Sequence, residues 1–82
     1  MNTNILYDIY TINRQSENED LTISMAKFQA TNSGALPHEE AKAMREFIGK
    51  HSKALSVAYR KGKAAFEAVA EVLYAEDVEA AQ

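Results

Sequence analysis

Residues 37–80 read PHEEAKAMREFIGKHSKALSVAYRKGKAAFEAVAEVLYAEDVEA, and this stretch decides the fold. Apolar or small residues return in it at alternating steps of four and three, which is the spacing of one face of an α-helix. Pro37 suits the first turn of such a helix, and Glu39 and Glu40 suit its positive end. The pattern predicts a single long helix over residues 37–79.

A helix of this length exceeds what the rest of the chain can cover. About 44 helical residues span about 66 Å, whereas a compact chain of this size has a radius of gyration of about 12 Å. We therefore expect the apolar row to be buried against a second copy, in a homodimer or higher oligomer. The predicted oligomer interface consists of Ile48, His51, Leu55, Ala58, Gly62, Ala65, Val69 and Val72.

Charge is divided between the two halves of this stretch. Residues 42–63 hold seven bases and one acid, whereas residues 64–82 hold five acids and no base. Antiparallel pairing of two copies about a point between Lys63 and Ala64 would lay each basic half over an acidic half. That register predicts four contacts, which are His51 with Glu76, Leu55 with Val72, Ala58 with Val69, and Gly62 with Ala65. The alternative is that these charges form an ordinary solvated surface.

Gly62 is the weak point of the long helix. Glycine inside a helix costs about 1 kcal/mol relative to alanine, so it either breaks the helix or permits close packing there. Lys61 and Lys63 are good helix formers, and this favours a continuous helix. If the helix breaks at Gly62, the prediction changes to a compact bundle within one chain.

Two shorter elements precede this stretch. A helix is expected over residues 17–31, because Ser16 and Glu19 have the spacing of a capping box. Residues 4–14 fit a helix through Ile5, Ile9 and Ile12, but β-branched and aromatic residues are dense there and a strand remains the alternative. The predicted fold is all-α, with two short N-terminal helices and one long C-terminal helix in a single small domain over 1–82.

Composition argues against several classes of protein. The 82 residues include no cysteine, no apolar run approaches a membrane span, and Met1–Asn4 lack the positive charge of a signal peptide. We expect a cytoplasmic protein of a bacterium or of an infected host cell. His38 and His51 do not share a helical face in the manner of a zinc pair, and the glycines form no phosphate-binding loop. No catalytic residue, metal site or cofactor is predicted, and the chain is not expected to be an enzyme.

The sequence therefore predicts a small helical interaction protein. We expect it to act on another macromolecule, most simply a protein, as a regulator or inhibitor; small acidic helical chains of this kind include viral antagonists of host machinery. One alternative is an oligomer that sequesters a nucleotide-like anion. Its candidate residues are Tyr59, Arg60, Lys61 and Lys63, which join one aromatic ring to three cations.

A second alternative depends on the first element being a strand. Strand, helix, helix is the order of a ribbon-helix-helix DNA-binding regulator. Neither face of a strand over residues 4–11 carries a base to neutralise phosphate. Nucleic acid is therefore not an expected partner, and no membrane contact is expected.

Overall fold

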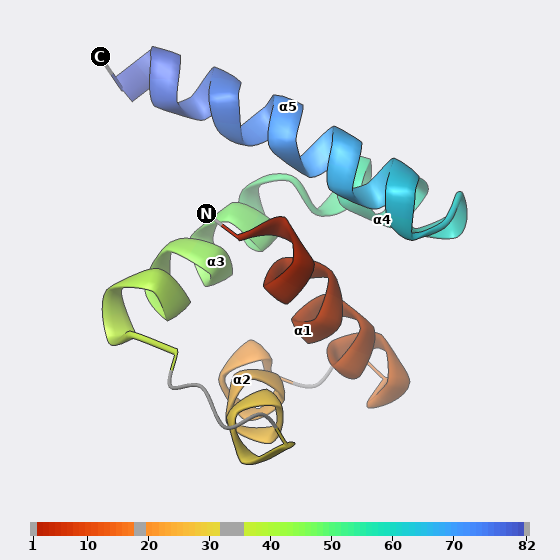
Figure 1. Ribbon diagram of the computed structural model, residues 1–82, viewed down its shortest axis with the longest axis vertical. Coiled ribbons are helices and arrows are strands. Elements are labelled where there is room, and N and C mark those ends of the chain that lie inside the picture. Colours follow the sequence, from red (N-terminus) through yellow and green to blue (C-terminus); the bar gives the residue numbers. More distant parts are fainter. Residues whose placement is uncertain (1, 18–19, 32–35, 82) are drawn as a thin grey trace.

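The computed structural model describes residues 2–17, 20–31 and 36–81, and helices make up most of that part of the chain (Figure 1). The prediction of an all-α fold is confirmed. Five helices lie within the described residues: α1 (Thr3–Gln15), α2 (Leu21–Thr31), α3 (His38–Lys50), α4 (Ser52–Arg60) and α5 (Lys63–Ala81).

The first element is a helix, so the alternative of a strand over residues 4–11 is wrong. The Asn2 side chain caps α1 by accepting hydrogen bonds from the backbone N–H groups of Asn4 and Ile5, at 3.0 and 3.4 Å. Its buried residues, Leu6, Ile9, Tyr10 and Asn13, follow helical spacing. The structure therefore gives no support to the ribbon-helix-helix alternative.

Asp20 fixes the start of α2, which begins at Leu21 and not at residue 17. Its carboxylate accepts a hydrogen bond from the Thr22 N–H at 2.7 Å, and this bond lowers the pKa of Asp20. The expected capping box includes Glu19, which lies outside the described residues. The first two helices are joined where Asn13 Nδ2 donates to Ser24 Oγ at 3.3 Å, both side chains being buried.

The prediction of one long helix over residues 37–79 is wrong, because the chain bends at His51 and turns back at Gly62. Gly62 has φ +108°, a conformation that side chains rarely permit. Hydrogen bonds from Lys61 N–H to Ala58 O and from Gly62 N–H to Tyr59 O close α4 just before this turn. The longest dimension of the molecule is 33 Å, about half the length of the expected rod.

The turn at Gly62 lets α4 and α5 pack against each other in one chain. His51 of the α3–α4 corner bonds Asp77 of α5, and Tyr59 near the end of α4 contacts Phe66 near the start of α5. The two helices are therefore antiparallel. Leu55 and Phe66, which are fully buried, join Ala70 in the core that this pairing creates. The turn at Gly62 is the alternative that the sequence offered, and it removes the reason for requiring a second chain.

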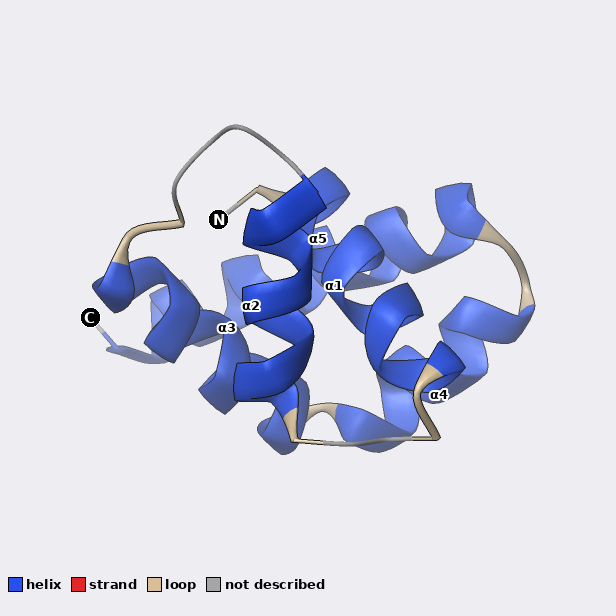
Figure 2. Cartoon of the chain, turned by 90° about the horizontal axis from the view of Figure 1, so that it is seen from below, coloured by secondary structure: helices blue, strands red, loops and turns tan. Residues whose placement is uncertain are grey.

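The core lies among all five described helices. In Figure 1 α5 runs along one side of the molecule and α2 lies on the opposite side, with α1 and α3 between them. Figure 2 shows the same arrangement from the side of α2, where α5 is the most distant helix. The core contains Leu6, Ile9, Tyr10, Met25, Phe28, Leu36, Ala41, Met44, Phe47, Ile48, Leu55, Phe66 and Ala70. Within the described ranges, no helix combines the length and apolar character needed to cross a bilayer.

The two glycines of the C-terminal half allow a matched test of the turn. Gly62→Ala forces a side chain onto a φ of +108° and should destabilise the protein by about 1–3 kcal/mol. Gly49→Ala is the control, because Gly49 lies in α3 and a Cβ there meets nothing within 4 Å. The control should stabilise by about 0.5–1 kcal/mol. Urea unfolding measures both, and a Gly62→Ala variant as stable as the wild type would contradict the turn.

Candidate interaction surface

Two adjoining hollows lie open on the outer side of the α4–α5 pair. The first has a volume of about 410 Å³ and is lined by Lys53, Ala54, Val57, Ala58, Lys61 and Val69. The second has a volume of about 250 Å³ and is lined by Ala68, Val69, Val72 and Leu73. Val69 belongs to both, so the hollows form one continuous surface. We name these nine residues the α4–α5 face.

Two valines project from this face into solvent. Val57 is 53% exposed and Val72 is 58% exposed, although both side chains are entirely apolar. Three other large apolar residues of the described chain are also well exposed, namely Ile23, Tyr74 and Val78. Ile23 belongs to α2, and Tyr74 and Val78 point away from Val72 in the helical phase of α5. Val57 and Val72, the two with the largest exposed fractions, thus lie on the same face.

Lysines flank the first hollow on the α4 side. They are Lys53 of α4 and Lys61, the residue that follows α4, and both are exposed. On α5, Glu76 lies one turn beyond Val72 and shares its side of the helix. The face therefore has an apolar centre with lysines on the α4 side, and Glu76 lies beside it on α5.

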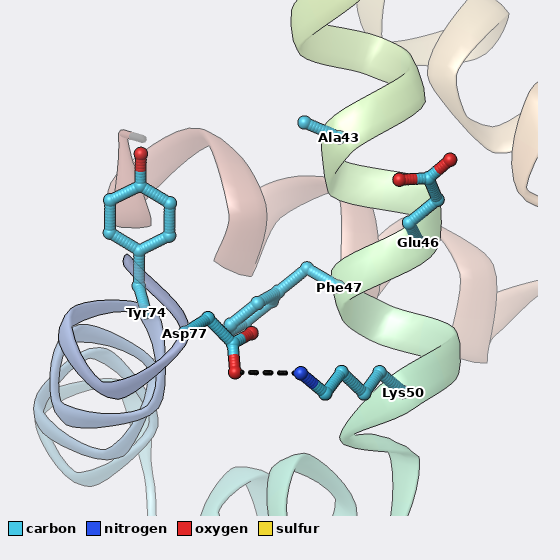
Figure 3. Close-up of a pocket in the computed structure, with 6 residues that line it drawn as sticks. All are labelled: Ala43, Glu46, Phe47, Lys50, Tyr74 and Asp77. Atoms are coloured by element: carbon cyan, nitrogen blue, oxygen red, sulfur yellow. Dashed lines mark hydrogen bonds and ion pairs between the residues drawn. The ribbon is translucent and has the colours of Figure 1, made fainter. Parts of the chain in front are cut away.

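A different pocket, of about 240 Å³, lies between α3 and α5 (Figure 3). Lys50 Nζ and Asp77 Oδ1 are 2.9 Å apart across it, and His51 Nε2 lies 2.9 Å from Asp77 Oδ2. The hydrogen bond from His51, followed by that from Lys50, lowers the pKa of Asp77. Phe47 packs on His51 at 4.8 Å and on Tyr74 at 6.4 Å between ring centroids. These contacts hold α5 against the α3–α4 corner, so the pocket residues stabilise the fold.

The predicted oligomer interface is divided by the turn. Ile48, Leu55 and Ala58 are buried within the single chain, His51 bonds Asp77, and Gly62 forms the turn. Ala65 and Val69 are half-buried and Val72 is exposed. The row was expected to face a second copy throughout. Its central part instead covers this chain's own core, and only Ala58, Val69 and Val72 line the α4–α5 face.

The antiparallel pairing predicted between two copies occurs within one. The prediction placed His51 against Glu76, and the structure places it against the next residue, Asp77. Of the four predicted contacts, this is the one that the fold approximates, since Val72, predicted to face Leu55, is exposed and Gly62 forms the turn. The apolar row did not specify whether the two halves belong to one chain or two.

The predicted anion-binding residues do not converge on one site. The Tyr59 ring stacks on Tyr7 at 5.5 Å, the Arg14 guanidinium lies 5.1 Å from its centroid, and its hydroxyl donates to Thr11 Oγ1. A base therefore has no open face of Tyr59 on which to stack. Lys63 lies 5.7 Å from the Tyr7 ring centroid. Arg60 and Lys61 are exposed, and Lys61 is the residue of this set that lines the α4–α5 face.

Sequence reasoning missed Lys53, Ala54 and Val57, which supply the α4 side of the face. Val57 lies off the apolar row, beside Ala58, so that row does not include it. Its residue type could have identified it, because a β-branched apolar side chain is unfavourable on a solvated helix surface.

The ion pair of Asp77 predicts a pH-dependent difference in stability. Because the pKa of Asp77 is lowered on folding, its contribution is present above the unfolded value of about 3.9. The contribution is lost as pH falls through the lower folded value. Asp77→Asn should therefore melt below the wild type at neutral pH, and the two melting temperatures should converge in strong acid. Glu79→Gln is the control, because Glu79 forms no ion pair with any other described residue. Equal melting of wild type and Asp77→Asn at pH 7 would refute this role.

Comparison with known proteins identifies no relative, since no protein-family model, curated protein or solved structure matches the chain.

Proposed function

We propose that the protein is a small non-enzymatic helical interaction protein that regulates or inhibits another macromolecule by binding it through the α4–α5 face. One observation carries the proposal. Val57 and Val72 are each more than half exposed beside open hollows. The large apolar side chains of the core, such as Leu55 and Phe66, are buried.

Such a face costs free energy until it is covered. Each square ångström of apolar surface left exposed to water costs about 25 cal/mol relative to burial. Contiguous exposed apolar patches mark binding sites. The face lies along two neighbouring helices, and a groove of this form accepts the apolar side of a third helix. We therefore propose that the bound segment is an amphipathic helix of another protein.

The lysines of the face indicate which charged residues the bound helix carries. Lys53 and Lys61 flank the apolar centre on the α4 side, and a partner with acidic residues beside its apolar row complements them. Rim charges of this kind mainly raise the rate of association, while the apolar centre supplies the affinity. The partner is accordingly proposed to be acidic where it crosses α4.

The roles of the polar residues inside the fold support binding over catalysis. His51 and Lys50 both hold Asp77 and thereby fix α5. Tyr59 joins α4 to α1 through its contacts with Tyr7 and Thr11. We place this activity in the cytoplasm of a bacterium or of an infected host cell, as expected from the composition.

Two exposed residues allow a matched test of the face. A photo-crosslinking residue at position 57 should capture the partner from host extract, whereas the same residue at position 23 should not, although Ile23 is 48% exposed and Val57 is 53% exposed. The captured protein is then purified and its affinity measured by calorimetry. Val57→Glu should weaken binding by at least about tenfold, as expected for a central contact.

The control variant is Ile23→Glu, which adds the same charge on α2 and should bind within about twofold of the wild type. Circular dichroism establishes that both variants are folded. If Val57→Glu binds the purified partner as tightly as the wild type, the α4–α5 face is not the binding site.

A further inference from the structure

We infer that, in the free protein, the α4–α5 face is covered by the same face of a second copy. The two copies form a two-fold dimer that must separate before another protein can bind. This inference rests on the proposed function, because it names what occupies the binding face in the absence of the partner. Three features of the face support it, namely the level of Val57 along the helices, the shape of the second hollow and the distribution of charge.

The contacts between α4 and α5 fix which residues lie at the same level. His51 meets Asp77 at one end, and Tyr59 meets Phe66 at the other. Because the helices are antiparallel and Val57 is nearer to Tyr59 than to His51, Val57 of α4 is level with Ala68 and Val69 of α5. The same register brings Lys53 level with the turn of α5 that contains Glu76.

The second hollow has the form that accepts a projecting side chain. It is bounded by Ala68, Val69, Val72 and Leu73 of α5. These four residues lie on two successive turns of α5 and leave an apolar hollow between them, into which an apolar side chain of another helix can project. The hole extends along α5 from Ala68 to Leu73, and this range includes the level of Val57.

A two-fold axis that is parallel to the helices, in the plane of the face, brings these features together. It places α4 of each copy over α5 of the other and keeps every residue at its own level. Val57 of one copy then lies over the hole in α5 of the second copy. The contact occurs twice, so Val57 and Val72 of each copy are covered.

Charge selects this arrangement over the other two-fold arrangement of the same face. With the axis parallel to the helices, Lys53 of each copy faces the level of Glu76 of the second copy, so opposite charges meet. With the axis perpendicular to the helices, α4 lies on α4, and Lys53 of one copy opposes Lys61 of the other. The second arrangement sets like charges against each other and is disfavoured.

The dimer is expected to be weak, because the contact area is small. The nine residues of α4 span about 13 Å, so the face is smaller than that of a standard interface, which buries about 800 Å² on each partner. This small area predicts a dissociation constant in the micromolar range or above. A partner protein that contributes a longer helix therefore displaces the second copy. Self-association thus limits the exposure of the apolar face without preventing partner binding.

Sedimentation over a concentration series tests the dimer. The wild type should pass from its chain mass of 9.1 kDa towards twice that mass as concentration rises to about 1 mM. Val57→Glu should remain at the chain mass. Lys53→Glu and Glu76→Lys should each weaken the dimer by about tenfold, because each places two pairs of like charges across the interface.

An equimolar mixture of Lys53→Glu and Glu76→Lys is the decisive sample. Every interface pair in the mixed dimer is again a lysine facing a glutamate, so the mixture should associate about as tightly as the wild type. A mixture no tighter than either variant alone overturns the arrangement, as does a wild type that stays at 9.1 kDa throughout.

Affinity for the crosslinked partner separates this inference from the proposed function. If the wild type is monomeric but Val57→Glu loses the partner, the binding face stands and the dimer is wrong. If the mixture restores the dimer while Val57→Glu keeps full partner affinity, the dimer stands and the face is not the partner site.

Discussion

The turn at Gly62 is the constraint on which the rest of the structure depends. Its φ of +108° reverses the chain between two good helices. Leu55 and Ala58 can then face Phe66 and Ala70 within one molecule. The turn also decides which residues remain outside, because Val57 and Val72 lie off the side that this pairing buries. Both the core and the α4–α5 face are therefore consequences of one backbone conformation.

The sequence predicted the helices better than their connections. Helical spacing identified Ile48, Leu55 and Ala58, which are buried, and Asp77 is one residue from the predicted contact of His51. Local rules alone do not decide the break at Gly62, since Lys61 and Lys63 favour a helix whereas glycine disfavours one. The energy that decides between a rod and a hairpin comes from burying Leu55 and Phe66 together, and this is a tertiary contribution that no local pattern contains.

The candidate surface was predictable only in part for the same reason. Val69, Val72 and Lys61 were singled out from the sequence, and all three line the face. Val57 and Lys53 were not, because the outer side of α4 is defined only after α5 has covered its inner side. Tyr59 shows the opposite error, since its ring and the neighbouring cations suggested a ligand site but pack against Tyr7 and Arg14. A row of apolar residues predicts that a surface will be covered, and the topology of the chain determines which residues cover it.

The distance between Ser52 and Glu79 tests the central claim most directly. Both residues are exposed and the sequence contains no cysteine, so single cysteines at these positions can carry spin labels without competing sites. The doubly labelled protein is diluted with unlabelled protein, and pulsed electron paramagnetic resonance then reports the distance within one chain. The hairpin predicts a distance below about 25 Å, since packed helices lie 8–10 Å apart. A continuous helix would place the labels about 40 Å apart, and that result would contradict the account.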